Sequence, residues 1–459
     1  MSDLTSPLSF SNISNISLAP AIIKLFPQLP SSSFSILQAH SDPNLITSSK
    51  RLAVCFSGGP APGGHNVVLA IAKLCEQNHH LFGITGGPAG LIAGNLRPLT
   101  VADCLAYQDQ GGFDLLQTDR TKLTSPNQIN AIKNVVKHFQ LDAIIIIGGD
   151  DSHTNAIFLA QELYDDNCAV IGVPKTIDGD LRYPPYLPIS FGYHSACELY
   201  TNLVENLIKD TKSVQKYWHF VKLMGRTSSH ITQHVAKHTN PDLFFIGEQI
   251  AHDNIPLAAI IMQIGDTILE SSAKNKPYGV ICIPEGLLEW IPDVKSLITS
   301  LNKHMQLGKR SSIIAKLSKS ETMLFHRFPN YIQDQLLLDR DSHGNIQLSR
   351  IETERCLIEM VKTYLNDRDP LFELTAMPHF FGYEGRCCPP NTFDTKLCNL
   401  LGHVAGSLAI HGYTGHMAGV NSITKPYQAY GIPIANLITL ETRHNKLVPV
   451  IKKTVVTDF

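Results

Sequence analysis

The sequence lacks the features that define several common protein classes. No apolar stretch approaches the roughly 18 to 20 residues that a membrane-spanning helix requires, and one of the longest, residues 141–147, already contains Asp142. Neither sign of charge dominates, because the sequence contains 38 Lys and Arg residues and 40 Asp and Glu residues. A broad polyanion-binding surface is therefore not expected, and neither nucleic acid nor a membrane is predicted as a partner.

The ten cysteines show no metal-binding or redox spacing. No CxxC pair occurs, and the only adjacent cysteines are Cys387 and Cys388. Zinc ribbons and thioredoxin-like sites therefore lack support. Free thiols are typical of a reducing compartment, and the first residues show no basic segment followed by an apolar one. We expect a cytoplasmic protein.

The order of apolar and polar segments predicts an α/β fold. Residues 1–50 are rich in Ser, Asn and Pro, and we interpret them as an N-terminal extension that is packed on a domain or partly disordered. From Arg51 onward, short apolar runs alternate with helical patterns, as in RLAVCF and NVVLAIAKLC. This alternation is typical of doubly wound parallel sheets, which bind ligands beyond the carboxyl ends of their strands. Residues 291–371 have mainly helical periodicity and suggest an insertion or cap on a second domain.

A glycine-rich loop follows the first predicted strand after the extension. The segment SGGPAPGGHN, residues 57–66, contains four glycines and precedes a helix. Its backbone could approach phosphate oxygens closely, and the amides at the helix start could bind the same anion. The loop has neither the P-loop lysine nor the GxGxxG spacing. A simple strand–helix turn is an equally weighted alternative.

A second loop places two carboxylates at the end of a buried strand. In GGDDSHTN, residues 148–155, Asp150 and Asp151 could hold a divalent cation. Mg²⁺ is usually bound by one or two carboxylates together with substrate phosphates. Capping of the following helix is the alternative, although it would account for only one of the two acids.

A third loop, PKTIDGD at residues 174–180, combines a cation with two acids. Lys175 could neutralise a transferring phosphoryl group, and Asp178 or Asp180 could accept the proton of an attacking hydroxyl. A surface turn with a chance ion pair is the alternative.

Groups suited to a sugar phosphate follow predicted strands later in the chain. MGR and YEGR end in Arg226 and Arg386, and IPEGL places Glu285 at a strand end. Arginine forms bidentate contacts with phosphate, and a carboxylate can accept hydrogen bonds from sugar hydroxyls. Each of these segments alone is weak evidence, because a single arginine is usually solvated or salt-bridged.

Together and in this order, these motifs resemble the phosphofructokinase superfamily, and specifically its pyrophosphate-dependent branch. The resemblance covers about residues 51–453 and also includes GGPAGL, QGGFD, KYWHFVKLMGR, IETE and RHNKLVPVIKK. It implies two Rossmann-like three-layer α/β domains with a helical insertion in the second and an active site between them. The first domain would be residues 51–215 joined by 425–459, and the second 216–424.

The resemblance implies a donor site that uses pyrophosphate. Gly58, Gly59 and Arg120 would contact the donor, and Asp150 would bind Mg²⁺ as the cofactor. Asp151 would occupy the space that the α-phosphate of ATP takes in ATP-dependent relatives, which have glycine at this position.

The resemblance also implies the chemistry and the acceptor. Lys175, a glycine in ATP-dependent relatives, would stabilise the transferring phosphoryl group. Asp178, assisted by Asp180, would accept the proton of the 1-hydroxyl of fructose 6-phosphate, giving fructose 1,6-bisphosphate reversibly. The residues implied in sugar binding are Thr176, Ile177, Lys216, Tyr217, Met224, Gly225, Arg226, Glu285, Tyr383, Glu384, Gly385 and Arg386. Lys216 and Tyr217 would reach the sugar site of a neighbouring subunit, which implies a homo-oligomer, with a dimer as the first expectation.

Two other functions stay open on the sequence. A catalytically silent regulatory subunit would bind sugar phosphate for a partner, but such relatives replace the acids of TIDGD, which are present here. An ATP-dependent phosphofructokinase is disfavoured by Asp151 and Lys175. Three positions depart from the family pattern, namely Asp119, His153 and His194, and for the two histidines we favour structural substitution over new chemistry.

Overall fold

The computed structural model describes residues 6–15, 19–41, 48–305, 308–338, 346, 351–424, 426–443 and 446–458. The chain divides into two compact units, which we call unit 1 (Met1–Ala196 with Glu384–Thr454) and unit 2 (Cys197–Tyr383 with Val455–Phe459). These boundaries differ from the expected 215/216 and 424/425. The first boundary falls inside helix α7 (Tyr193–Val214), which runs on without a break and therefore leaves no linker in the sequence. The chain returns to unit 1 within helix α17 (Tyr383–Cys387), well before residue 425.

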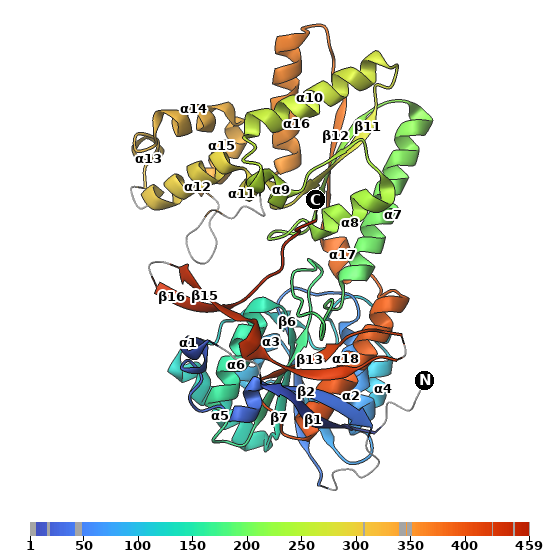
Figure 1. The fold of residues 1–459 in the computed structure, drawn as a ribbon, viewed down its shortest axis with the longest axis vertical. Coiled ribbons are helices and arrows are strands. Elements are labelled where there is room, and N and C mark those ends of the chain that lie inside the picture. The colour runs from blue at the N-terminus through green and yellow to red at the C-terminus, as the bar shows by residue number, and fades with distance from the viewer. Residues whose placement is uncertain are drawn as a thin grey trace. The chain divides into compact units, whose positions relative to one another are not determined.

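Unit 1 is built on a mixed sheet, which among the described residues has ten strands (Figure 1). The strand order is β1-β2-β14-β13-β8-β7-β3-β4-β5, and β6 pairs with β3. The strands are β1 (Leu8–Asn15), β2 (Ser35–Ser41), β3 (Arg51–Ser57), β4 (His80–Ile84), β5 (Leu96–Pro98), β6 (Thr118–Asp119), β7 (Ala143–Gly148), β8 (Ala169–Pro174), β13 (His416–Val420) and β14 (Ala429–Pro433). Strands β13, β8, β7, β3 and β4 are parallel, and β14, β2, β1 and β5 pair antiparallel. The N-terminal extension thus contributes β1 and β2 to the sheet.

The sheet of unit 1 is doubly wound. From β3 the chain crosses to β4 on one side, and from β7 it crosses to β8 on the other. Because such crossovers are right-handed, the connecting helices α2 (Gly64–Cys75) and α6 (Asp150–Glu162) cover opposite faces of the sheet (Figure 1). The direction reverses between β3 and β7, and ligands bind at such a reversal in this class of sheet.

The remaining elements of unit 1 complete these layers. They are α1 (Pro20–Ile23), α3 (Gly87–Ala93), α4 (Val101–Leu105), α5 (Pro126–Phe139), α18 (Thr392–Ile410), the 3₁₀ helices η1 (Ser31–Phe34) and η4 (Ile434–Leu437), and the hairpin β15 (Ile438–Arg443) and β16 (Lys446–Ile451). Helix α18 packs against α2, and α3 packs against α5. Local sequence explains α5, because Ser125 and Gln128 form a capping box and Pro126 occupies the first turn. Its buried Ile132 and Val136 are four residues apart and join the core cluster that includes Ile144 of β7.

Unit 2 contains, among its described residues, a four-stranded parallel sheet with the order β10-β11-β9-β12. The strands are β9 (Trp218–Leu223), β10 (Leu243–Phe244), β11 (Gly279–Pro284) and β12 (Ala376–Phe381). The helices are the part of α7 from Cys197 onward, α8 (His230–Thr239), α9 (Gly247–His252), α10 (Leu257–Ala273), α11 (Leu287–Trp290), α12 (Pro292–His304), α13 (Arg310–Ile314), α14 (Lys319–Arg327), α15 (Asn330–Leu338) and α16 (Thr353–Arg368). The prediction of a mainly helical segment at residues 291–371 is confirmed by α12 to α16. No helix in the described part of the chain is both long and apolar enough to cross a membrane.

A buried ion pair connects the sheet of unit 2 to the helix that follows the insertion. Lys222 on β9 places its Nζ 3.0 Å from Oε2 of Glu354 on α16 and donates to the carbonyl oxygen of Ile351 at 3.0 Å. The two charged side chains are only 4% and 7% exposed. A charge left without its partner at such a depth is strongly destabilising.

Replacing Lys222 with methionine is therefore expected to lower the free energy of unfolding by about 3 to 5 kcal/mol. Urea unfolding followed by tryptophan fluorescence measures the loss, because the chain's two tryptophans, Trp218 and Trp290, both belong to unit 2. Lys237→Met is the matched control, since Lys237 is 57% exposed and pairs with an exposed Asp458. Its loss should stay below about 1 kcal/mol, and equal losses in the two variants would contradict the interpretation of the buried pair.

Candidate active site

Unit 1 brings the three predicted loops to one edge of its sheet. Strands β3, β7 and β8 are adjacent and parallel. The residues that follow them therefore leave the sheet at the same edge. Residues 58–63 lead into α2, residue 149 leads into α6, and residues 175–180 form a loop after β8.

The glycine-rich loop presents its backbone to two guanidinium groups. Gly58 adopts φ +85°, a left-handed conformation that favours glycine, and its N–H donates to the carbonyl oxygen of Asp119 at 2.8 Å. A Cβ atom at Gly59 would lie 3.3 Å from Nη2 of Arg120 and 3.3 Å from Cζ of Arg386. A side chain at Gly59 would thus crowd both arginines. Backbone amides and two arginines converging on one loop suit a polyanionic ligand.

The Lys175 ammonium lies between the glycine-rich and the acidic loops. Its Nζ is 3.8 Å from the position that a Cβ atom would take at Gly58, and 3.8 Å from the corresponding position at Gly149. The side chain is buried. Burial and the nearby Arg386 lower the pKa of Lys175 to about 8, although the carboxylates of Asp178 and Asp150 act in the opposite direction.

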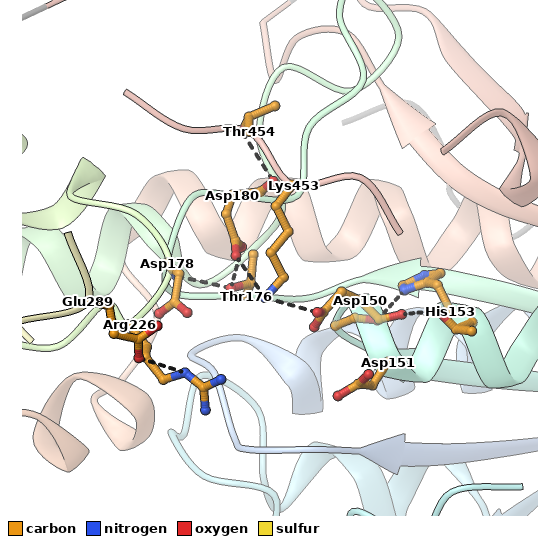
Figure 2. A network of polar contacts seen from close by, with 12 residues as sticks. Asp150, Asp151, His153, Thr176, Asp178, Asp180, Arg226, Glu289, Lys453 and Thr454 are labelled. Atoms are coloured by element: carbon orange, nitrogen blue, oxygen red, sulfur yellow. Dashed lines mark hydrogen bonds and ion pairs between the residues drawn. The ribbon is translucent and has the colours of Figure 1, made fainter. Parts of the chain in front are cut away.

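The two acids of the second loop have different surroundings. Asp150 places Oδ2 2.9 Å from Nζ of Lys453 (Figure 2). Burial alone would raise the pKa of Asp150, but the Lys453 ammonium outweighs it and holds this pKa below its usual value. Asp151 is 68% exposed and lies 4.0 Å from Nζ of Lys122. The N-cap position of α6 is Gly149, which has no side chain, so capping from that position does not explain the acids.

The third loop is held in shape by hydrogen bonds that Figure 2 shows. Thr176 Oγ1 accepts from the N–H of Asp178 at 3.0 Å and donates to Oδ1 of Asp180 at 3.3 Å. Gly179 adopts φ +70° between the two acids. The carbonyl oxygen of Asp180 accepts from both the N–H and the hydroxyl of Thr454, at 2.8 and 3.1 Å. Ile177, which belongs to the same loop, is buried.

Lys453 is a site residue that the sequence analysis missed. Its Nζ lies 3.6 Å from Oδ2 of Asp180 in addition to its contact with Asp150. Burial would lower the pKa of Lys453, but the two carboxylates raise it above the ordinary value. The motif RHNKLVPVIKK, which ends in Lys452 and Lys453, was the signal, but the sequence contains nothing that tells one lysine from the other.

The carboxylate expected to bind a cation in this cluster is that of Asp150. Within the described ranges, no three His, Cys, Asp or Glu side chains are grouped closely enough to hold a metal ion by themselves. Asp150 supplies a hard oxygen ligand, and Mg²⁺ commonly completes its coordination with water and substrate phosphates. The residues therefore fit Mg²⁺ that binds together with a phosphate ligand.

Unit 2 gathers a second polar group at the carboxyl edge of its sheet. Strands β11, β9 and β12 are adjacent and parallel, and they are followed by Glu285, residues 224–226 and Tyr383 respectively. The N–H of Gly225 donates to Oε2 of Glu285 at 3.1 Å. Arg226 is 58% exposed, and its Nε lies 3.8 Å from Oε1 of Glu289 (Figure 2). Glu289 was not predicted, although it follows Glu285 by four residues in EGLLEW.

Other predicted sugar-binding residues lie elsewhere in the chain. Lys216 and Tyr217 precede β9, so they are at the opposite end of this strand from Met224, which is buried. The structure of the single chain does not bring them to the edge that carries Glu285. Residues 384–386 belong to unit 1, where Arg386 lies beside the glycine-rich loop as described above.

The three departures from the family pattern make local contacts. His153 is buried behind the acidic loop, where its Nδ1 donates to the carbonyl oxygen of Gly149 at 2.7 Å, and burial lowers its pKa to about 4. The His194 ring packs on Phe393 with ring centres 3.8 Å apart. The Asp119 carboxylate accepts hydrogen bonds from the N–H groups of Ala89 and Thr121, at 3.1 and 3.0 Å. These contacts favour the interpretation of the histidines as structural.

Comparison with known proteins gives consistent similarities. The phosphofructokinase family model matches residues 51–408. The chain is 40% identical to the pyrophosphate--fructose 6-phosphate 1-phosphotransferase subunit beta 2 of Arabidopsis thaliana over 451 residues, which are 95% of this chain and 79% of that protein. It is 40% identical over 430 residues to the Treponema pallidum protein named pyrophosphate--fructose 6-phosphate 1-phosphotransferase, with 88% and 75% of the two chains covered.

A solved structure shows the same fold. The crystal structure of the pyrophosphate-dependent phosphofructokinase of Marinobacter aquaeolei matches with a TM-score of 0.60 at 15% identity, covering 84% of this chain and 83% of that one. The predicted fold class, two α/β domains of phosphofructokinase type, is thereby confirmed.

Proposed function

Because this chain belongs to the phosphofructokinase family, we propose that it transfers a phosphoryl group reversibly between pyrophosphate and the 1-hydroxyl of fructose 6-phosphate. The products in the forward direction are fructose 1,6-bisphosphate and phosphate. The relatives named above carry this activity in their names. The observation that carries the proposal is the Lys175 ammonium, which lies between the backbones of Gly58 and Gly149, next to the loop that bears Asp151.

The donor would be bound by the positive groups of unit 1. Pyrophosphate carries several negative charges on a small volume, and Lys175, Arg120 and Arg386 supply three cations around the glycine-rich loop. Their fixed positions stabilise charge on the transferring phosphoryl group without reorganisation during the reaction. Asp150 would hold Mg²⁺, which supplies further neutralisation of the phosphate oxygens when it is bound.

Asp178 would act as the general base. The hydroxyl of the acceptor must lose its proton as it attacks phosphorus, and a carboxylate within hydrogen-bond reach can accept that proton. The N–H of Asp178 is fixed by Thr176, and Gly179 allows the turn that separates Asp178 from Asp180. These contacts support a base held in a fixed position.

The acceptor would be bound by the polar groups of unit 2. Glu285 is oriented by the N–H of Gly225 and can accept hydrogen bonds from sugar hydroxyls. Arg226 is half-exposed and suited to the 6-phosphate. Lys216 and Tyr217, at the other end of β9, would complete the site of a second subunit, which supports a homo-oligomer with a dimer as its simplest form.

All ten cysteines are free, which supports a cytoplasmic location.

Two alternatives are less well supported. A silent regulatory subunit would not need the acids at Asp178 and Asp180, both of which are present and held by hydrogen bonds. An ATP-dependent enzyme would need space without negative charge for the α-phosphate of ATP, and the Asp151 carboxylate would occupy that space.

The direct test measures fructose 1,6-bisphosphate formation by purified protein with Mg²⁺ and either donor. We expect the protein to form fructose 1,6-bisphosphate with pyrophosphate as donor and not with ATP. Product formed with ATP and not with pyrophosphate would reject the proposal.

Replacing Asp151 with glycine is expected to raise kcat/KM for ATP by at least about 100-fold, because like charges placed together cost several kcal/mol. The kinetics of both donors in the two proteins measure this. Asp151→Asn keeps the volume and removes the charge, so it separates charge from size as the cause. If neither variant uses ATP better than the unchanged protein, Asp151 does not select the donor.

A further inference from the structure

The segment that follows β16 contacts the proposed catalytic loop. It consists of Lys452, Lys453 and Thr454, and it lies beyond residue 408, where the family match ends. Two of its three residues contact the loop after β8, and one also contacts the loop after β7. Nothing in the motifs of the sequence analysis assigns a role to this segment.

A continuous path of contacts leads from Lys453 to the proposed base (Figure 2). Nζ of Lys453 lies 3.6 Å from Oδ2 of Asp180, and Oδ1 of the same carboxylate accepts from Thr176 Oγ1 at 3.3 Å. That hydroxyl oxygen accepts from the N–H of Asp178 at 3.0 Å. The position of the Asp178 backbone thus depends on a side-chain network that ends at Lys453.

The same ammonium joins two loops that come from different strands. It is 2.9 Å from Asp150, which follows β7, and it reaches Asp180, which belongs to the loop after β8. Thr454 adds two hydrogen bonds to the carbonyl oxygen of Asp180. The Lys453 ammonium neutralises the repulsion between the carboxylates of Asp150 and Asp180, and this repulsion would remain if the ammonium were removed.

The neighbouring lysine provides a contrast within the same segment. Lys452 is exposed, and its N–H donates to the carbonyl oxygen of Leu437 as part of the backbone at the end of the hairpin. It has the same charge and nearly the same place in the chain as Lys453. A general effect of positive charge near the site would therefore involve both lysines, whereas the geometry distinguishes Lys453.

We propose that Lys453 is a positioning residue for the phosphoryl transfer: its ammonium holds Asp150 and the loop that bears Asp178 in the arrangement that the reaction needs. This inference rests on the proposed function. Lys453 is 32% exposed and Asp150 is 37% exposed, so this ion pair contributes little to global stability. Asp180 is only 7% exposed, and any stability that its pairing with Lys453 adds should be preserved in Lys453→Arg, which keeps the charge.

The test compares Lys453→Met, Lys453→Arg and the matched control Lys452→Met. In Lys453→Met, kcat should fall about 100-fold, as expected for a small misplacement of reacting groups, while KM for fructose 6-phosphate stays unchanged. Lys453→Arg should recover part of kcat, because it restores the charge. Lys452→Met should equal the unchanged protein, and Lys453→Arg should keep the thermal midpoint of the unchanged protein.

A second readout does not depend on turnover. Mg²⁺ binding to the metal-free protein, measured by titration calorimetry with inorganic phosphate present and no fructose 6-phosphate, should become tighter in Lys453→Met, because Asp150 loses a competing cation. Lys452→Met should bind Mg²⁺ as the unchanged protein does.

The outcomes separate this inference from the function on which it rests. If the unchanged protein forms no fructose 1,6-bisphosphate, the proposed function fails. If it is active and Lys453→Met is as active as Lys452→Met, only the role of Lys453 is rejected. A loss of kcat that Lys453→Arg does not reverse, together with a lowered thermal midpoint, would also reject it in favour of a purely structural role.

Discussion

Replacing Asp178 with asparagine is expected to lower kcat by a factor of about 10² to 10⁴, the usual contribution of a general base. Asparagine keeps the shape of the side chain but cannot accept the proton of the 1-hydroxyl. KM for fructose 6-phosphate should change little, because the groups proposed to bind the sugar are untouched. Steady-state kinetics with pyrophosphate and Mg²⁺ measure both quantities.

The control for this variant is Asp165→Asn, which removes an exposed carboxylate of unit 1 that is not part of the three loops. It should leave kcat unchanged. If Asp178→Asn retains more than about a tenth of the activity, a loss well below that of a general base, another group accepts the proton and the assignment of Asp178 is wrong.

Replacing Lys175 with methionine is expected to lower kcat/KM for pyrophosphate by about 10² to 10³, the effect of removing one preorganised group that stabilises the transition state. The variant removes the ammonium that lies between Gly58 and Gly149 and leaves the two arginines in place. Kinetics with varied pyrophosphate measure the change. An unchanged kcat/KM would show that the arginines alone stabilise the transferring group.

The pH dependence gives a sharper form of the same prediction. The pKa of Lys175 is lowered to about 8, first by burial and then by Arg386. In the proposed role the reactive form of Lys175 would be the protonated one. Because kcat/KM reports the free enzyme, this quantity should fall as the pH rises through about 8. In Lys175→Arg the alkaline fall should disappear, because arginine stays protonated. An alkaline fall that persists in this variant would assign it to another group.

The carboxyl-edge groups were predictable from the sequence because their positions follow from strand order. Residues at the ends of parallel neighbouring strands must meet at one edge, so Gly58, Asp150 and Lys175 could be grouped from motifs that are local in sequence. The helical segment at residues 291–371 was equally accessible, because its period is a local property.

Contacts between segments far apart in the chain were not accessible in this way. The approach of Lys453 to Asp150 depends on the path of the β15–β16 hairpin, and its neighbour Lys452 has an identical side chain. The boundary between the two units could not be predicted either, because it lies inside the continuous helix α7, and a helix lacks the Gly-, Pro- or Ser-rich composition of a linker. The strands β1 and β2 form in a Ser-rich and Asn-rich segment, where pairing with the existing sheet edge at β14 outweighs local propensity.

The central claim, reversible phosphoryl transfer between pyrophosphate and fructose 6-phosphate, is tested most directly by ³¹P NMR of the reaction mixture. Purified protein and Mg²⁺ would be supplied in one sample with pyrophosphate and fructose 6-phosphate, and in another with phosphate and fructose 1,6-bisphosphate. With all starting reactants at the same concentration, both samples should approach the same mixture of the four species, with the 1-phosphate signal appearing in the first and the pyrophosphate signal in the second. Unchanged spectra in both samples, or phosphate released from pyrophosphate without any sugar 1-phosphate, would contradict the account.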